Sequence, residues 1–406
     1  MEKRYSLLTS HRSAELVILF LILRVFTSVV ALVPSAFPRP EALDKQQQSS
    51  LEIMVPVWPP SHDVTIWLER IGTAPWQRWD AKYFVSALTK GFSTSDGSAS
   101  FHPLMVWLAA PISYTSGSPI LALLTIATLS TLCLYLAFST LAQLDLTKPD
   151  ARRATLLFAL FPLSYVFYAP YTESTFLLFA VLCFLFARQR KWLLAGLCGG
   201  VATLGRQQGL FLLVPLAYEL WISKERDFKA LISVTLIPSA YLFWILYRAI
   251  ALSDSALDLS SLQGLIYSVF ISSSSKQVIA EQAFVFPPYA VYLALVKLWQ
   301  SPNVPMALDL LFGLVFLVLT IASWKGLRTS YRLYTLVILV ISFSLSTGMI
   351  YSSTYMGLPR HLLLAFPIFI GLAPRLGEYA ASKLYKVGFF GLLLMTFIHC
   401  LGVWVP

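Results

Sequence analysis

The sequence predicts an all-α, polytopic integral membrane protein with about 11 transmembrane helices, and three observations support this. The 406 residues are 57% hydrophobic and only 12% charged, whereas a soluble domain has about 25% charged residues. The apolar residues form continuous stretches that suit membrane-spanning helices, without the alternation of a membrane β-barrel. The basic residues gather in short clusters between these stretches, as the positive-inside rule predicts.

The basic residues indicate topology rather than a nucleic-acid surface. The net charge is +10, but the clusters recur at every second connection. This bias predicts a cytoplasmic amino terminus and a long first loop on the outer or luminal side. Such clusters contact anionic membrane lipids, so lipid is an expected partner and nucleic acid is not. The clusters are Lys3, Arg4 and Arg12; Lys148, Arg152 and Arg153; Arg188, Arg190 and Lys191; Lys224, Arg226 and Lys229; Lys325, Arg328 and Arg332; and Arg375, Lys383 and Lys386.

The amino-terminal part predicts a membrane anchor followed by a long external loop. Residues 13–33 form the first span, which we interpret as uncleaved, and residues 34–103 form the first extracytoplasmic loop. Within that loop, residues 34–76 predict irregular structure, whereas residues 81–90 have an apolar stripe with helical spacing. Residues 104–112 are apolar but too short to cross the membrane, so they predict an interfacial helix.

Further apolar stretches complete the predicted membrane body, which we interpret as one domain covering residues 1–406. Residues 287–299 carry Tyr, Lys and Trp side chains and fit another interfacial helix. No internal repeat of the kind found in many transporters is visible. The remaining predicted spans are residues 119–144, 154–168, 174–187, 192–204, 210–222, 231–251, 306–324, 333–350, 362–373 and 387–403.

A carboxylate flanked by aromatic residues lies in the external loop. Asp80 follows Trp79 and precedes Tyr83. At a membrane–water boundary this carboxylate could accept a proton from an acceptor hydroxyl, while the aromatic rings stack on a sugar. Asp is also a preferred N-cap residue, so Asp80 equally fits a cap for the helix expected at residues 81–90. The two roles can coexist, because a capped carboxylate is well oriented.

Two further charged residues are expected on the same external face. Glu173 lies where the chain is expected to re-enter the membrane after a short external turn. An acid there indicates function or a favourable charge at a helix N-terminus, and both interpretations remain open. Arg206 lies between two glycines with Gln207 beside it. Its guanidinium could bind phosphate oxygens, and snorkelling to lipid headgroups is the alternative.

Arg24 and Arg360 are the remaining candidate cations. Arg24 lies near the middle of the first span, where an arginine costs about 2.5–3.5 kcal/mol, so it is expected to face protein or a wet cavity. Arg24 could form a buried ion pair with an acid, or it could contact a ligand, and both interpretations remain open. Arg360 and His361 follow a proline at the mouth of a late span and suit either a phosphate site or an interfacial anchor. His102 precedes the interfacial helix, where a lone histidine is more often structural.

Common cofactor and nucleophile motifs are absent from the sequence. It contains no phosphate-binding P-loop, no His-Glu-x-x-His zinc motif and no serine nucleophile elbow. We therefore expect neither a cofactor nor a metal.

At these residues the chain resembles the PIG-V family, the GPI mannosyltransferase 2 group of the GT-C superfamily of polytopic glycosyltransferases. The resemblance covers most of the length and depends on the order and external placement of short motifs. It departs from the family pattern at His102, where a second aromatic is commoner, and at Gln207-Gln208, where Ser-Asn is commoner. A prokaryotic relative with an acceptor other than GPI also fits. The motifs are Arg78-Trp79-Asp80-Ala81-x-Tyr83-Phe84, Phe101-His102-Pro103, Tyr168-Ala169-Pro170-Tyr171-Thr172-Glu173-Ser174, Gly205-Arg206-x-x-Gly209 and Pro359-Arg360-His361 before Phe366-Pro367.

The resemblance implies transfer of a mannosyl group, with inversion, from a polyprenyl- or dolichyl-phosphate donor to a glycolipid acceptor. It also implies that the acid of the first external loop, here Asp80, is the general base. We expect Glu173 to be the second catalytic acid. The expected donor-phosphate ligands are Arg206, Arg360 and Arg24. The expected substrate contacts are Trp79, Tyr83, His102, Tyr171, Gln207 and His361.

Two other functions remain compatible with the sequence. One is a lipid or oligosaccharide transporter or flippase, which many spans and an intramembrane Arg24 would also serve. The other is a non-catalytic membrane subunit, and an enzyme with a small partner subunit fits as well. The expected location is the plasma membrane in a prokaryote or the endoplasmic reticulum in a eukaryote, with the active site on the extracytoplasmic or luminal side.

Overall fold

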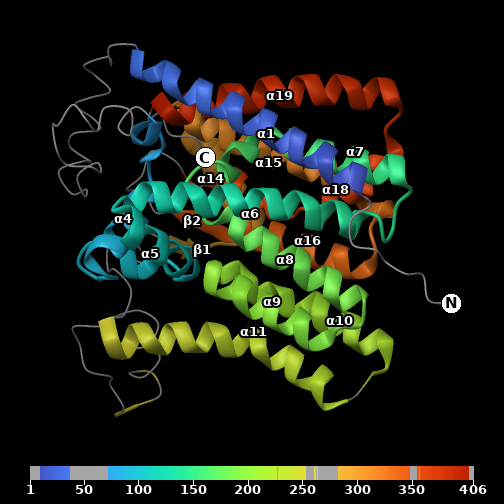
Figure 1. The fold of residues 1–406 in the computed structure, drawn as a ribbon, viewed down its shortest axis with the longest axis horizontal. Helices are drawn as coiled ribbons and strands as arrows, with labels where there is room; N and C mark the ends of the chain where they lie inside the picture. Colours follow the sequence, from blue (N-terminus) through green and yellow to red (C-terminus); the bar gives the residue numbers. More distant parts are fainter. Residues whose placement is uncertain are drawn as a thin grey trace.

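The computed structural model describes residues 10–36, 72–225, 227–252, 260–261, 263, 282–347, 354–355 and 357–401. Over these ranges the chain is almost entirely helical, which confirms the all-α fold class, and its long helices run roughly parallel across the molecule (Figure 1). Much of the expected loop 34–103 lies outside the described residues, as do the ends of the expected spans 333–350 and 387–403.

Five of the described helices are long and apolar enough to cross a bilayer. The chain is therefore an integral membrane protein, as the composition predicts. These helices expose many large aliphatic and aromatic side chains, which suits contact with lipid. They are α1 (Ser10–Leu32), α6 (Pro119–Ala142), α11 (Phe228–Tyr247, continued by the π-helical turn η7, Arg248–Leu252), α15 (Val304–Ser323, continued by η9, Trp324–Gly326) and α19 (Glu378–Leu401).

Polar residues cap three of these long helices at their N-termini. The Ser118 side chain accepts a hydrogen bond from the Leu121 amide at the start of α6, and Pro119 occupies the first turn. Asp227 caps α11 and Asn303 caps α15 in the same way. These three helices therefore begin where the sequence places a short acceptor side chain before the apolar run.

The segment between α1 and α6 includes two helices, α4 and α5, that lie together at one end of the bundle (Figure 1). Helix α4 (Ala81–Lys90) has the predicted bounds. Helix α5 (Leu104–Ser116) runs beyond the predicted residue 112 and ends where Gly117 adopts a left-handed conformation. Short 3-10 turns accompany them at η1 (Val33–Ala36), η3 (Ala74–Trp76) and η4 (Ser98–Ser100).

The segment between α6 and α11 is divided into short helices. The expected span 154–168 is not one helix, because α7 ends at Ala159 and a 3-10 helix starts at Pro162. Proline has no amide hydrogen and its ring disfavours helix in the preceding residue. The elements are α7 (Lys148–Ala159), η5 (Pro162–Phe167), α8 (Glu173–Arg188), α9 (Trp192–Gly205), η6 (Gln207–Leu212) and α10 (Leu213–Ser223).

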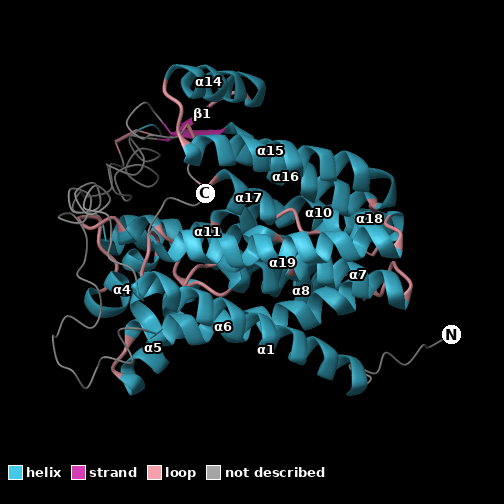
Figure 2. Ribbon diagram, turned by 90° about the horizontal axis from the view of Figure 1, so that it is seen from above, coloured by secondary structure: helices cyan, strands magenta, loops and turns pink. Residues whose placement is uncertain are grey.

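The last part of the described chain adds a small antiparallel strand pair that the sequence analysis did not predict. Strands β1 (Gln282–Phe284) and β2 (Leu345–Thr347) place Ala283 opposite Ser346, and α14 (Pro287–Gln300) lies at the edge of the molecule beside β1 (Figure 2). The expected span 362–373 is interrupted at Pro367. The other elements are α16 (Thr329–Ser344), α17 (Leu358–Leu363), α18 (Pro367–Leu372) and η10 (Ala373–Arg375).

Glycines allow the backbones of α9 and α11 to touch. A β-carbon at Gly196 would lie 2.3 Å from the carbonyl oxygen of Ser233, and one at Gly200 would lie 3.1 Å from that of Leu236. In membranes, where lipid tails are as apolar as leucine, small residues permit this close van der Waals packing. The α9–α11 contact therefore holds α9 in place, and Arg206 directly follows the last residue of that helix.

A polar network ties several helices together where α6 and α8 end. Arg188 Nη1 lies 2.7 Å from Asp145 Oδ2, which also accepts a hydrogen bond from the Tyr331 hydroxyl at 3.0 Å. Arg328 lies 3.4 Å from Glu219 of α10. Arg188 and Arg328, which the sequence analysis assigned to topology, thus also form ion pairs that hold the start of α16 against neighbouring helices.

Candidate active site

The turn that carries Asp80 is fixed from two sides. The Arg78 amide donates to the Trp76 carbonyl at 2.9 Å, and Arg78 Nη2 donates to the Cys400 carbonyl of α19 at 3.3 Å. Trp79 has φ +50°, a left-handed conformation that costs a non-glycine residue about 1–3 kcal/mol and persists only where the surroundings impose it. Asp80 occupies the N-cap position of α4, as predicted, but its side chain makes no cap hydrogen bond to the helix.

Four charged side chains from distant parts of the chain form a connected network beside this turn. Arg360 Nη1 donates to Asp80 Oδ2 at 2.9 Å and lies 3.7 Å from Glu173 Oε1. Arg206 Nη1 donates to the same Glu173 oxygen at 2.8 Å and to Thr172 Oγ1 at 2.9 Å. The structure therefore brings together Asp80, Glu173, Arg206 and Arg360, which the sequence analysis expected on one face.

Burial in this network decreases outward toward Asp80. The Glu173 side chain is fully buried, and those of Arg360 and Arg206 are 7% and 11% exposed, whereas Asp80 is 26% exposed. Two acids balance two guanidinium groups, which is how buried charges are tolerated. Burial lowers the pKa of Arg360, but Asp80 and Glu173 raise it more, so the net pKa shift is upward. Asp80 is consequently the network's accessible carboxylate.

Buried aromatic residues pack against Arg360 and against one another. The Tyr171 ring lies 4.9 Å from the Arg360 guanidinium carbon in a cation–π contact, and its hydroxyl donates to the Arg78 carbonyl at 3.4 Å. The buried His399 ring of α19 packs edge-on against Tyr171 and at 5.2 Å from Tyr165. Tyr171 is only 1% exposed, so it contacts Arg360 and is not an open surface for a sugar.

Two glycines bring the arginines into place. A β-carbon at Gly209 would lie 2.4 Å from the backbone of Thr203, so only glycine lets η6 fold back on α9 and present Arg206. Gly357 has φ +72°, and a β-carbon there would lie 3.0 Å from Arg360 Nε. The sequence analysis identified the first of these positions through the Gly205-Arg206-x-x-Gly209 motif but not the second.

Arg24 faces protein, as its place in the first span predicts. It donates to the Tyr168 carbonyl at 2.9 Å and its guanidinium lies over the Trp76 ring at 5.6 Å. In the described structure it pairs with no carboxylate. Its contacts connect α1 to the segments on either side of the network, so its expected role as a phosphate ligand is not supported by these contacts.

His102 lies apart from the carboxylates. Its ring stacks at 6.2 Å on Tyr241 and lies 6.4 Å from Trp244, both on α11. Burial and the charge of Arg248 lower the His102 pKa to about 3, despite a hydrogen bond with the Thr203 backbone. The histidine is therefore neutral and helps to join α5, α9 and α11.

The other expected substrate contacts have mixed surroundings. Tyr83 stacks on Phe101 with ring centroids 4.8 Å apart. Gln207 is exposed at the start of η6, and His361 is partly buried in α17, where the charges of Arg206 and Arg360 act on it. Trp79, Gln207 and His361 are the sequence neighbours of Asp80, Arg206 and Arg360, whereas the Tyr171 ring contacts Arg360 directly.

Sequence reasoning missed several residues of this site. Thr172 accepts a hydrogen bond from Arg206, and Gly357 lies close to Arg360. The His399 ring packs against both Tyr165 and Tyr171. The glycine before Leu358-Pro359 was a usable signal, because a glycine just before a helix commonly supplies an unusual backbone angle. His399 gave no signal, since it lies within an apolar stretch.

Comparison with known proteins adds little to these contacts. No protein-family model matches the chain, and no curated protein matches it. Among solved structures the chain is similar to the Archaeoglobus fulgidus oligosaccharyltransferase tethered to an acceptor peptide containing the NVT sequon. The identity is 11% and the TM-score is 0.43, with 95% of this chain and 56% of that chain covered. The chain thus spans little more than half of that structure's length, and a likeness this low carries no argument about function.

Proposed function

We propose that this protein is a membrane glycosyltransferase of the GT-C type, which transfers a sugar from a lipid-phosphate donor to a glycolipid acceptor. The observation that carries the proposal is the hydrogen bond between Asp80 and Arg360 within a network that also holds Glu173 and Arg206. The network lies beside the amphipathic helix α4. The motif resemblance to the PIG-V family supports mannose as the sugar.

Asp80 is the proposed general base. The acceptor hydroxyl oxygen attacks the anomeric carbon, its proton passes to the Asp80 carboxylate, and the bond from the anomeric carbon to the donor phosphate oxygen breaks. Attack opposite the leaving phosphate inverts the anomeric centre. General-base catalysis of this kind is worth about 10²–10⁴-fold. Asp80 fits because it is the most exposed acid of the network.

Glu173 is a positioning residue in this proposal rather than a second catalytic acid. Its fully buried side chain holds Arg206 and lies near Arg360. A guanidinium has five N–H groups, and the ion pairs of both arginines use Nη1. Their other N–H groups would stabilise the charge that develops on the leaving phosphate.

The test is an assay of the purified protein in liposomes with polyprenyl-phosphate mannose and a glycolipid acceptor. The expected result is transfer with inversion, determined by NMR of the product's anomeric proton, and its loss in Asp80→Asn. Transport of the donor across the liposome membrane without any transfer would instead identify a transporter. Activity that appears only with an added membrane subunit and is unchanged in Asp80→Asn would identify a non-catalytic component.

A further inference from the structure

A cleft far from the carboxylate–arginine network opens between α1, α6 and α7. Its volume is about 550 Å³, within the range of small-molecule sites, which is about 300–1,000 Å³. In Figure 1 the first turns of α1 lie near α7 at one end of the bundle, and α4 lies at the other. The cleft and the proposed active site are therefore on opposite sides of the membrane body.

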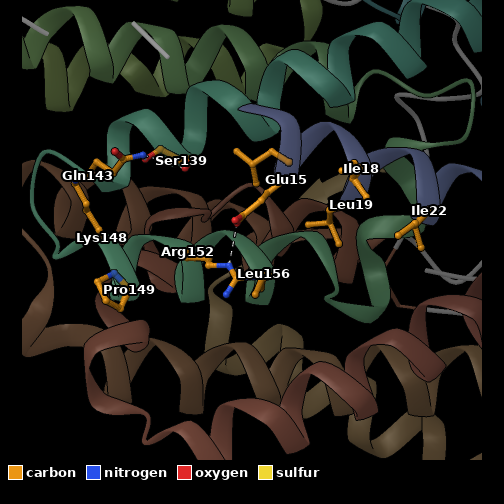
Figure 3. Close-up of a pocket in the computed structure, with 11 residues that line it drawn as sticks. Glu15, Ile18, Leu19, Ile22, Ser139, Gln143, Lys148, Pro149, Arg152 and Leu156 are labelled. Atoms are coloured by element: carbon orange, nitrogen blue, oxygen red, sulfur yellow. Dashed lines mark hydrogen bonds and ion pairs between the residues drawn. The ribbon is translucent and has the colours of Figure 1, made fainter. Parts of the chain in front are cut away.

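The cleft is amphipathic along its length. Ile18, Leu19 and Ile22 of α1 line one part of it (Figure 3). Ile18 is 56% exposed and Ile22 is 46% exposed. Since α1 is one of the helices suited to span the bilayer, this apolar wall faces the hydrocarbon region. A lipid chain could enter from the side.

The other part of the cleft is polar and carries a net positive charge. Lys148 and Arg152 contribute two cations and Glu15 one acid, with Ser139 and Gln143 beside them (Figure 3). Glu15 lies 3.5 Å from Arg152, and the two side chains are 60% and 68% exposed. Exposed pairs of this kind contribute about 0–1 kcal/mol, so an incoming anion can replace Glu15 at little cost.

We propose that this cleft binds an anionic phospholipid of the surrounding bilayer. The phosphate lies between Lys148 and Arg152, and an acyl chain follows Ile18 and Ile22 along α1. Basic pockets between membrane helices recognise acidic lipid headgroups through this combination of charge and apolar surface. The lipid joins α1 to α7 at the end of the bundle away from Asp80. This inference does not depend on the proposed enzymatic activity.

The experiment is native mass spectrometry of the full chain in detergent, with dioleoyl phosphatidylglycerol or dioleoyl phosphatidylcholine as the probe. The wild type is expected to retain one phosphatidylglycerol in preference to phosphatidylcholine. Lys148→Gln with Arg152→Gln should weaken phosphatidylglycerol binding about tenfold or more, since each basic residue near the surface contributes on the order of 1 kcal/mol. Glu15→Gln should tighten binding, because it removes the competing acid.

Two controls separate a built site from general attraction to basic protein. Lys383→Gln with Lys386→Gln removes the same charge from exposed positions of α19 and should leave the retained lipid unchanged. Ile18→Trp fills the cleft without altering charge and should abolish retention. Equal losses in the two double variants, or full retention in Ile18→Trp, would overturn the proposal. Stronger retention of undecaprenyl phosphate than of phosphatidylglycerol would overturn the assignment to a bilayer phospholipid.

Discussion

Arg360 donates a hydrogen bond at 2.9 Å to Asp80, although 280 residues separate the two in the sequence. The carboxylate lies on the turn before α4, and the guanidinium comes from the short helix α17. Because Arg360 also lies 3.7 Å from the fully buried Glu173, Asp80 is held by a cation that is itself held from inside the protein.

Asp80→Asn is expected to reduce sugar transfer by about 10²–10⁴-fold, the typical value of a general base. The amide keeps the size of the side chain but cannot accept the proton. The measurement is the rate of product formation at saturating donor. Asp96→Asn is the matched control, because Asp96 lies between α4 and α5 and accepts a hydrogen bond from the Ser98 amide at 2.8 Å. Comparable transfer by wild type and Asp80→Asn would remove the base assignment.

Glu173→Gln is expected to destabilise the fold by about 3–5 kcal/mol, because it leaves the buried Arg206 guanidinium without its acid partner. The measurement is the free energy of unfolding in detergent, with remaining transfer assayed in parallel. Glu378→Gln is the control: Glu378 also pairs with an arginine, but its side chain is 87% exposed, and such pairs contribute about 0–1 kcal/mol. An unfolding free energy for Glu173→Gln close to that of this control would contradict the structural role.

Gly357→Ala is expected to impair transfer beyond its effect on stability. Gly357 has φ +72°, and the added methyl would lie 3.0 Å from Arg360 Nε, so Arg360 must move. Gly117→Ala is a matched control, since Gly117 has φ +69° with open space around it. Both variants should lose about 1–2 kcal/mol to backbone strain, and only Gly357→Ala should lose transfer. Equal activity in the two variants, at equal folded fractions, would sink this prediction.

Lys82 predicts a pH dependence of stability near the proposed site. Burial and the neighbouring Arg78 lower the Lys82 pKa from 10.5 to about 8, with Asp80 opposing the shift. Between these pH values the unfolded chain binds more protons than the folded one, so stability rises as pH increases from 8 to 10.5. Lys82→Met should remove this rise in the free energy of unfolding. Lys90→Met, at the exposed end of the same helix, should retain it.

The apolar stretches were sufficient to predict the long membrane helices, because each of these helices follows a continuous apolar run, and Ser118 and Asp227 mark where two of them begin. The interruptions at Pro162 and Pro367 were harder to predict, since proline within an apolar stretch can kink a membrane helix or end it. Strands β1 and β2 have three residues each, too few to show an alternating pattern.

For the site, sequence order alone placed Asp80, Glu173, Arg206 and Arg360 on one face. It could not predict which arginine pairs with which carboxylate, because the pairing depends on how α8, η6 and α17 pack. Arg206 and Arg360 were therefore assigned to an incoming phosphate, although each already has an acid partner. His399 was missed for a similar reason, since its place beneath Tyr171 follows from the docking of α19.

The hydrogen bond from Arg78 to the Cys400 carbonyl bears on how the protein is made. The loop carrying Asp80 emerges from the ribosome early, yet one of its anchors belongs to the last described helix. During insertion into the membrane, the Asp80 turn cannot reach its final geometry until that helix has docked. A chain released before this point would already contain every charged residue of the network and still lack the contact that holds the Asp80 turn in place.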